Sequence, residues 1–165
     1  MGVSGCGKST LGALLADALQ CRFLEGDDYH SNAAIEKMRG GEPLDDADRW
    51  PWIDRLGDAT SRAVAEKGVA VTACSALRRS YRDRLRATIR YPVRLILLEN
   101  SRQRLIERLS TRSGHFMPLG LLDSQLATLE RPLADEDALR LVSEEPAMRL
   151  RDRALAELPR PQRPE

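Results

Sequence analysis

The residues whose chemistry is easiest to recognise stand at the beginning of the chain, where positions 2–9 read G-V-S-G-C-G-K-S. This is the spacing of a phosphate-binding loop, in which successive backbone N–H groups surround phosphates at the start of a helix. In such a loop Gly2 and Gly7 allow the tight path, Lys8 contacts the β- and γ-phosphates and the Ser9 hydroxyl binds Mg²⁺. The residues predicted to surround a nucleoside triphosphate are Gly2, Val3, Ser4, Gly5, Cys6, Gly7, Lys8, Ser9 and Thr10.

A second feature is the acidic run 25–28, which follows the short apolar segment 21–24. A phosphotransferase needs a carboxylate near the acceptor hydroxyl, either to take its proton or to hold it in line with the γ-phosphate. Asp27 stands where such a group is needed, although a loop carboxylate or a helix cap has the same sequence. His30 is either a hydrogen-bond partner for a polyol or carboxylate, or a solvated loop histidine.

Two segments carry arginines that could hold anions. Residues 75–82 begin a helix, so its N-terminal N–H groups, with Arg78 or Arg82 on one helical face, predict an anion pocket; a solvated charged face is the alternative. Residues 104–116 run from a helical pattern into a segment with glycine and arginine, before another helical pattern. This arrangement is typical of a lid that closes over phosphates, and equally of a helical hairpin with surface charges.

The pattern of apolar residues indicates the elements that position these groups. The predicted strands cover residues 21–24, 69–74, 93–98 and, more weakly, 138–142. The predicted helices cover residues 10–19, 33–39, 46–67, 78–89, 101–109 and 119–129. Alternating strands and helices predict an α/β fold with a doubly wound parallel sheet covered on both faces. Ligands bind beyond the carboxyl ends of such strands, where the polar clusters described above lie.

Composition excludes several classes of protein. The 165 residues suffice for one domain, and no apolar run reaches the roughly 18 residues that span a membrane. A net charge of +1 argues against a nucleic-acid-binding protein. Cys6, Cys21 and Cys74 lack metal-ligand spacing, so we expect reduced thiols in a soluble, cytoplasmic protein that binds neither nucleic acid nor membranes. The sequence leaves a homodimer open, and residues 159–165 are expected to be a frayed tail.

One expected element is missing. A phosphate loop is normally entered from an apolar strand, but here only Met1 precedes Gly2. We therefore expect the natural start to lie upstream. A chain that begins at Met1 should have an open groove in its sheet beside the loop, reduced thermal stability and weak or no activity.

Several blocks, with the loop, resemble gluconokinases in order and spacing from residue 1 to about residue 137. They are L-E-G-D-D-Y-H, I-E-K-M-x-x-G-E-P-L, A-C-S-A-L-R-R-S-Y-R-D and R-S-G-H-F-M. The second and third blocks are not demanded by a nucleotide-binding fold. The resemblance implies a single P-loop kinase domain over residues 1–165, similar to nucleoside-monophosphate kinases, with a helical lid at about 108–130. It also implies transfer of phosphate from ATP to D-gluconate with Mg²⁺.

Carried over by position, the resemblance implies roles for individual residues. Lys8, Asp27 and Arg112 would be catalytic, Ser9 would bind the metal, and Arg108 would contact the nucleotide. Glu25 stands where an aspartate is common, and its charge is compatible with an outer-shell role near Mg²⁺. The residues implied to bind gluconate are Asp27, His30, Lys37, Arg49, Ser75, Arg78, Arg82 and His115. The alternatives are a shikimate or nucleoside-monophosphate kinase, and a nucleotide-binding protein without catalysis.

Overall fold

A computed structural model describes residues 1–111 and 119–158 of the chain. Its strands are β1 (Arg22–Glu25), β2 (Ala70–Ala73), β3 (Leu95–Glu99) and β4 (Ala138–Val142). Its helices are α1 (Lys8–Ala18), α2 (Asn32–Arg39), α3 (Asp46–Lys67), α4 (Arg79–Thr88), α5 (Arg102–Ser110), α6 (Leu119–Thr128) and α7 (Ala147–Glu157), with short 3₁₀ turns η1 (Gly26–Tyr29) and η2 (Ala134–Glu136). Every strand and helix predicted from the sequence is present, and α7 is an addition.

The long helix α3 has clear start and stop signals in the sequence. Asp45 caps its first turn: its carboxylate accepts a hydrogen bond from the Asp48 N–H at 2.9 Å, and the Asp48 carboxylate accepts one from the Asp45 N–H at 3.2 Å. The helix ends at Gly68, whose φ of 76° is a left-handed conformation that glycine adopts without strain. Trp52, Ile53 and neighbouring apolar residues then bury one face of this helix against the strands.

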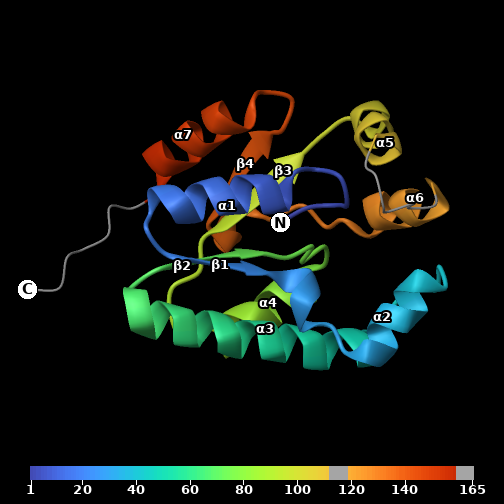
Figure 1. The fold of residues 1–165 in the computed structure, drawn as a ribbon, viewed down its shortest axis with the longest axis horizontal. Coiled ribbons are helices and arrows are strands. Elements are labelled where there is room, and N and C mark those ends of the chain that lie inside the picture. Colours follow the sequence, from blue (N-terminus) through green and yellow to red (C-terminus); the bar gives the residue numbers. More distant parts are fainter. Residues whose placement is uncertain (112–118, 159–165) are drawn as a thin grey trace, which may run out of the picture.

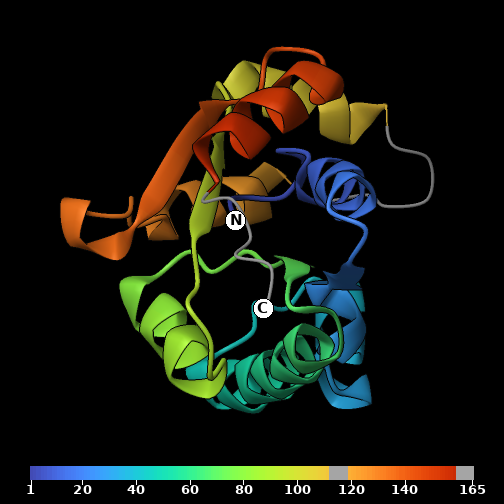
Figure 2. The same ribbon diagram turned by 90° about the vertical axis from the view of Figure 1, so that its left-hand side faces the viewer.

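The strands form two parallel pairs. In one pair, β1 runs beside β2 with Arg22 opposite Ala70; in the other, β3 runs beside β4 with Leu95 opposite Ala138. The parallel sheet is open between these pairs, as the sequence predicts, because β2 and β3 are not hydrogen-bonded neighbours in the described chain. Figure 2 shows the green α3 and α4 on one side of the strands and the red α7 on the other. The fold has the helix–strand–helix layers that were predicted.

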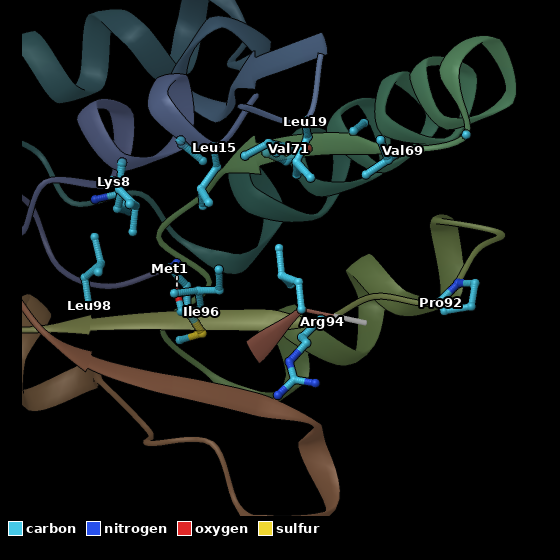
Figure 3. A pocket seen from close by; sticks show the side chains of 17 residues that line it. Met1, Lys8, Leu15, Leu19, Val69, Val71, Pro92, Arg94, Ile96 and Leu98 are labelled. Carbon is cyan, nitrogen blue, oxygen red and sulfur yellow. Dashed lines mark hydrogen bonds between the residues drawn. The ribbon is translucent and has the colours of Figure 1, made fainter. Parts of the chain in front are cut away.

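A groove of about 350 Å³ lies between β2 and β3 (Figure 3). Met1 enters it like one residue of a strand: its amine donates to the Ile96 carbonyl oxygen, and its own carbonyl accepts from the Leu98 N–H at 3.0 Å. Apolar side chains, among them Leu15 and Val71, line the walls. Burial lowers the pKa of the Met1 amine to about 6. This groove lies where the sequence predicts an unfilled position in the sheet.

Two apolar cores lie on either side of this groove. Leu11 and Leu15 of α1 pack with Leu98, Leu105 and other residues of the β3–β4 half. Helices α3 and α4 enclose a second core beneath β1 and β2. In Figure 1, the N-terminal end of α1, helix α2 and helix α6 lie toward the same end of the molecule. Within residues 1–111 and 119–158, none of the helices has both the length and the apolar character needed to cross a membrane.

Candidate active site

The phosphate loop adopts the backbone that its glycines permit. Gly2, Gly5 and Gly7 have φ values of 137°, 79° and 98°, and Gly7 directly precedes α1. A Cβ atom on Gly2 would lie 2.8 Å from the carbonyl oxygen of Leu98, so a larger residue would displace the backbone of β3. The Gly2 N–H donates to the Ser75 carbonyl at 3.1 Å, which anchors the loop to the end of β2.

The side chains of Lys8 and Gln125 both make hydrogen bonds to the backbone of this loop. The Lys8 ammonium donates to the Val3 carbonyl oxygen at 3.0 Å, so the charged group already lies across the loop. The side-chain oxygen of Gln125, on α6, accepts a hydrogen bond of 2.7 Å from the Ser4 N–H. Because α6 belongs to the predicted lid segment, this contact joins the lid segment to the loop. Nothing in the local sequence singles out Gln125.

A cleft of about 460 Å³ opens beside the loop. Its lining includes Lys8, Ser9, Thr10, Glu25, Asp27 and Arg108. The structure therefore brings the predicted phosphate, metal and acceptor groups into one space, although they come from three separate parts of the chain. These groups meet because the carboxyl end of β1 and the start of α1 lie at the same edge of the sheet.

Asp27 is positioned by the packing of α3. The Trp52 indole Nε1 donates to the Gly26 carbonyl oxygen at 2.7 Å, directly before Asp27 in η1. Gly26 itself passes close to β2, since a Cβ there would lie 2.4 Å from the Ala73 carbonyl oxygen. The Asp27 side chain is exposed to the cleft. The buried contacts of Trp52 and Gly26 thus support the turn that carries the solvent-facing carboxylate of Asp27.

His30 stacks on the same tryptophan. Its ring centroid lies 4.3 Å from that of Trp52, with an angle of 14° between the planes. Burial lowers the pKa of His30, with Arg55 and Arg49 acting in the same direction and Asp27 opposing them. Its Nδ1 is buried and has no hydrogen-bond partner among the described residues. A neutral imidazole with an unused ring nitrogen therefore stands close to Asp27.

Arg108 reaches the loop from α5. Its guanidinium donates to the Ser143 carbonyl oxygen at 2.7 Å and to the Cys6 carbonyl oxygen at 3.4 Å. The buried Ser143 hydroxyl donates to the same Cys6 carbonyl at 2.8 Å. Ser143 follows β4 and has no sequence signal that would have identified it. These contacts fix Arg108 at the edge of the cleft.

The other predicted substrate residues do not lie together. Arg49 and Arg78 meet at Tyr81, on the α3–α4 side of the site. The Lys37 ammonium contacts both carboxylate oxygens of Asp48, at 3.0 and 2.8 Å, which joins α2 to α3. This contact raises the pKa of Lys37. His115, predicted to bind gluconate, and Arg112, predicted to be catalytic, lie outside the described residues.

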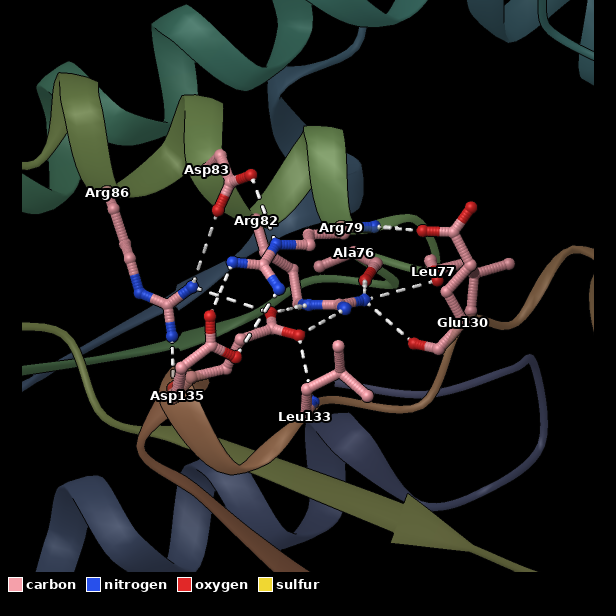
Figure 4. A network of polar contacts seen from close by, with 10 residues as sticks. Ala76, Leu77, Arg79, Arg82, Asp83, Arg86, Glu130, Leu133 and Asp135 are labelled. Carbon is pink, nitrogen blue, oxygen red and sulfur yellow. Dashed lines mark hydrogen bonds and ion pairs between the residues drawn. The ribbon is translucent and has the colours of Figure 1, made fainter.

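Arg82 differs from the prediction. It is 1% exposed, and its Nε and Nη2 donate to the two carboxylate oxygens of Glu136 at 2.5 and 2.9 Å (Figure 4). Its Nη1 donates to the Glu130 carbonyl at 2.9 Å and to two carbonyls of the loop after β2. Protein contacts that join α4 to the segment after α6 therefore occupy the group for which the helical spacing predicted an anion and the resemblance implied gluconate. These hydrogen bonds lower the pKa of Glu136 to about 2.

A glycine-rich loop at the start of a helix, beside the carboxyl end of a parallel strand, defines a P-loop nucleotide-binding fold. A family model described as an AAA domain matches residues 1–132. A gluconokinase from Gluconobacter oxydans is 47% identical over 144 residues, covering 87% of this chain and 80% of that protein. The crystal structure of a gluconokinase from Sinorhizobium meliloti superposes with a TM-score of 0.84 and 42% identity, covering 94% of this chain and 87% of that chain.

A sugar kinase from Janibacter, solved without ligand, is similar to the same degree, with a TM-score of 0.86 and 43% identity over 94% of this chain and 90% of that chain. These similarities extend over most of both chains. This chain belongs to the gluconokinase family.

Proposed function

We propose that this protein transfers the γ-phosphoryl group of ATP to D-gluconate, giving ADP and 6-phospho-D-gluconate. The observation that carries the proposal is that Asp27 and the phosphate loop line one cleft, in a chain with 47% identity to a gluconokinase. An acceptor hydroxyl must meet both the γ-phosphate and a carboxylate, and this cleft offers both neighbours.

The loop and Lys8 act on the nucleotide. Backbone N–H groups and the start of α1 hold the phosphates, and the Lys8 ammonium exchanges its contact with Val3 for phosphate oxygens. Asp27 holds the acceptor hydroxyl and takes its proton as the oxygen bonds to the γ-phosphorus. The bond from that phosphorus to the bridging oxygen of ADP breaks in the same displacement. Arg108 stabilises negative charge at the edge of the cleft.

The oxygen groups at the cleft fit Mg²⁺, which prefers hard oxygen ligands and keeps several waters. Ser9 would hold the ion through its hydroxyl, with Glu25 and Asp27 in reach of the same cleft. When bound, the ion neutralises charge on the phosphates.

Arg112 and His115 belong to the proposed lid, at about 108–130 of a single 1–165 domain, and would complete the site on closure. We place the enzyme in the cytoplasm.

The substrate end of the site is formed by His30, Arg49 and Arg78. His30 offers its free Nδ1 to a hydroxyl group, and the two arginines offer positive charge for a carboxylate. Lys37 and Ser75 are assigned to the same end. Arg82 is assigned to support of the loop after β2, since all three guanidinium nitrogens already donate to protein groups.

ADP release, measured with ATP, Mg²⁺ and each of three acceptors, tests the proposal. Gluconate should support release, whereas shikimate and nucleoside monophosphates should not. Release with either rival acceptor and none with gluconate would assign a different kinase activity. Nucleotide binding without ADP release, whichever acceptor is present, would indicate a nucleotide-binding protein without catalysis.

A further inference from the structure

Tyr81 brings two arginines from different helices to one point. The residue lies on α4 and is 3% exposed, with its ring in the core between α3 and α4. Its hydroxyl accepts a hydrogen bond of 2.9 Å from Arg49 Nη1 and donates one of 2.5 Å to Asp46 Oδ1. A phenol hydroxyl can both donate and accept a hydrogen bond, and here it uses both functions to link a cation to an anion.

The face of the Tyr81 ring makes cation–π contacts with both Arg49 and Arg78. The guanidinium carbons of Arg49 and Arg78 lie 5.4 and 5.7 Å from the ring centroid. Trp50 packs against the ring edge-on, at a centroid distance of 5.3 Å, and so fixes the ring orientation. Cation–π contacts of this kind favour a guanidinium that is partly removed from water.

The charges at this cluster do not balance. Asp46 lies 3.6 Å from Arg78 and is the one carboxylate among the described residues that contacts the cluster. Arg49 has no carboxylate within 4 Å in the described part of the chain. Two arginines thus share one counter-ion, although like charges repel. Such a pair is ready to receive a second carboxylate, for which planar guanidinium groups have matching geometry.

The cluster stands at the correct end of the site for the substrate proposed above. Arg49 lies three residues before Trp52 on α3, so the two share one face of the helix, and Trp52 stacks on His30. In accord with this arrangement, Arg49 lowers the pKa of His30, whereas Asp27 raises it. In a six-carbon sugar acid, the primary hydroxyl and the carboxylate occupy opposite ends of the molecule. With the hydroxyl at Asp27, the carboxylate extends past His30 toward Arg49 and Arg78.

We propose that Tyr81 is a positioning residue that holds Arg49 and Arg78 as a receptor for the substrate carboxylate. The inference rests on the proposed function, because it assigns the acidic end of that substrate.

Tyr81→Phe tests the role, since it keeps the ring and removes only the hydroxyl. We expect the KM for gluconate to rise by about tenfold, the loss typical of a hydrogen bond to a charged group, while kcat and the KM for ATP stay within about twofold. Tyr91→Phe is the matched control, because that tyrosine is 41% exposed and lies beyond the end of α4. It should behave like the parent enzyme.

A double-mutant cycle separates positioning from general support. If Tyr81 acts through Arg49, then Tyr81→Phe should add little to the KM of Arg49→Gln. Additive effects on KM, or a fall in kcat with the gluconate KM unchanged, would overturn the proposal. If Tyr81→Phe melts below the assay temperature, Arg49→Lys serves as the second variant, because it keeps the charge but loses the planar guanidinium group. An unchanged KM for gluconate in Arg49→Lys would overturn the proposal that Arg49 and Arg78 bind the carboxylate. Failure of the proposed function is distinguishable, since the parent enzyme would then show no gluconate-dependent ADP release.

Discussion

The Trp52 indole and the Gly26 carbonyl oxygen are joined by a buried hydrogen bond of 2.7 Å. This bond connects the second turn of α3 to the turn that carries Asp27, so the packing of this helix determines where the acceptor carboxylate lies. His30 stacks on the face of the same indole. One buried side chain therefore positions two groups of the proposed substrate site.

Asp27→Asn should lower kcat by at least about a hundredfold while the Kd for ATP stays nearly unchanged, because the carboxylate acts on the acceptor. Nucleotide titration beside steady-state kinetics measures both quantities. Asp28→Asn, an exposed neighbour in the same turn, is the control. An equal loss of ATP binding would instead assign Asp27 to the metal.

Lys8→Ala should reduce gluconate phosphorylation by roughly 10²–10³-fold, because the ammonium neutralises charge on the transferring phosphoryl group. Lys67→Ala removes an exposed lysine at the end of α3 and should leave the rate unchanged. The measurement is kcat at saturating ATP and gluconate. A rate within about threefold of the parent for Lys8→Ala would refute the role.

Glu136→Gln should destabilise the fold by roughly 3–5 kcal/mol, because it leaves the buried Arg82 guanidinium without a counter-ion. The pKa of Glu136 is lowered from 4.5 to about 2 in the folded protein. Its contribution to stability is therefore fully present above about pH 4.5 and is lost as the pH falls toward 2.

Thermal melting of the parent and of Glu136→Gln between pH 2 and pH 7 measures this effect. The difference between their melting temperatures should be largest near neutral pH and should shrink below pH 4.5. Asp135→Asn, an exposed neighbour, is the control. Parallel curves for the parent and Glu136→Gln over the whole range would contradict the assignment.

An apolar extension of five or six β-branched residues before Met1 should raise both the melting temperature and the kinase rate. It would continue the hydrogen bonds of Met1 along β3 and fill the groove, at roughly 1.5–3 kcal/mol for each side chain buried. An extension of the same length made of glycine and serine is the control. Equal melting temperatures and equal rates for the two chains would show that this strand position is dispensable.

Local sequence signals predicted the elements well because they act over short distances. The span of α3 follows from a cap at Asp45 and a glycine at its end, and β3 from an apolar run. The burial of Arg82 in an ion pair could not be predicted, because its partner Glu136 is 54 residues away. Ser143 and Gln125 were missed for the same reason, since only the tertiary fold brings them to the loop.

The division of the sheet into two pairs has a different origin. The groove that Met1 enters separates β2 from β3, so each of these strands pairs only with its other neighbour, β1 or β4, in the described chain. Helix α7 has only two buried positions, Leu150 and Ala154, and three of its eleven residues are arginines, so its apolar periodicity was too weak to predict.

The most direct test of the account is ³¹P NMR of the chain with the apolar extension, incubated with ATP, Mg²⁺ and D-gluconate, beside the Asp27→Asn variant. We expect the γ-phosphate signal of ATP to be replaced by a phosphomonoester that couples to the C6 protons of gluconate, and the variant to form it far more slowly. Consumption of ATP without that phosphomonoester, or its formation at the same rate by Asp27→Asn, would contradict the account.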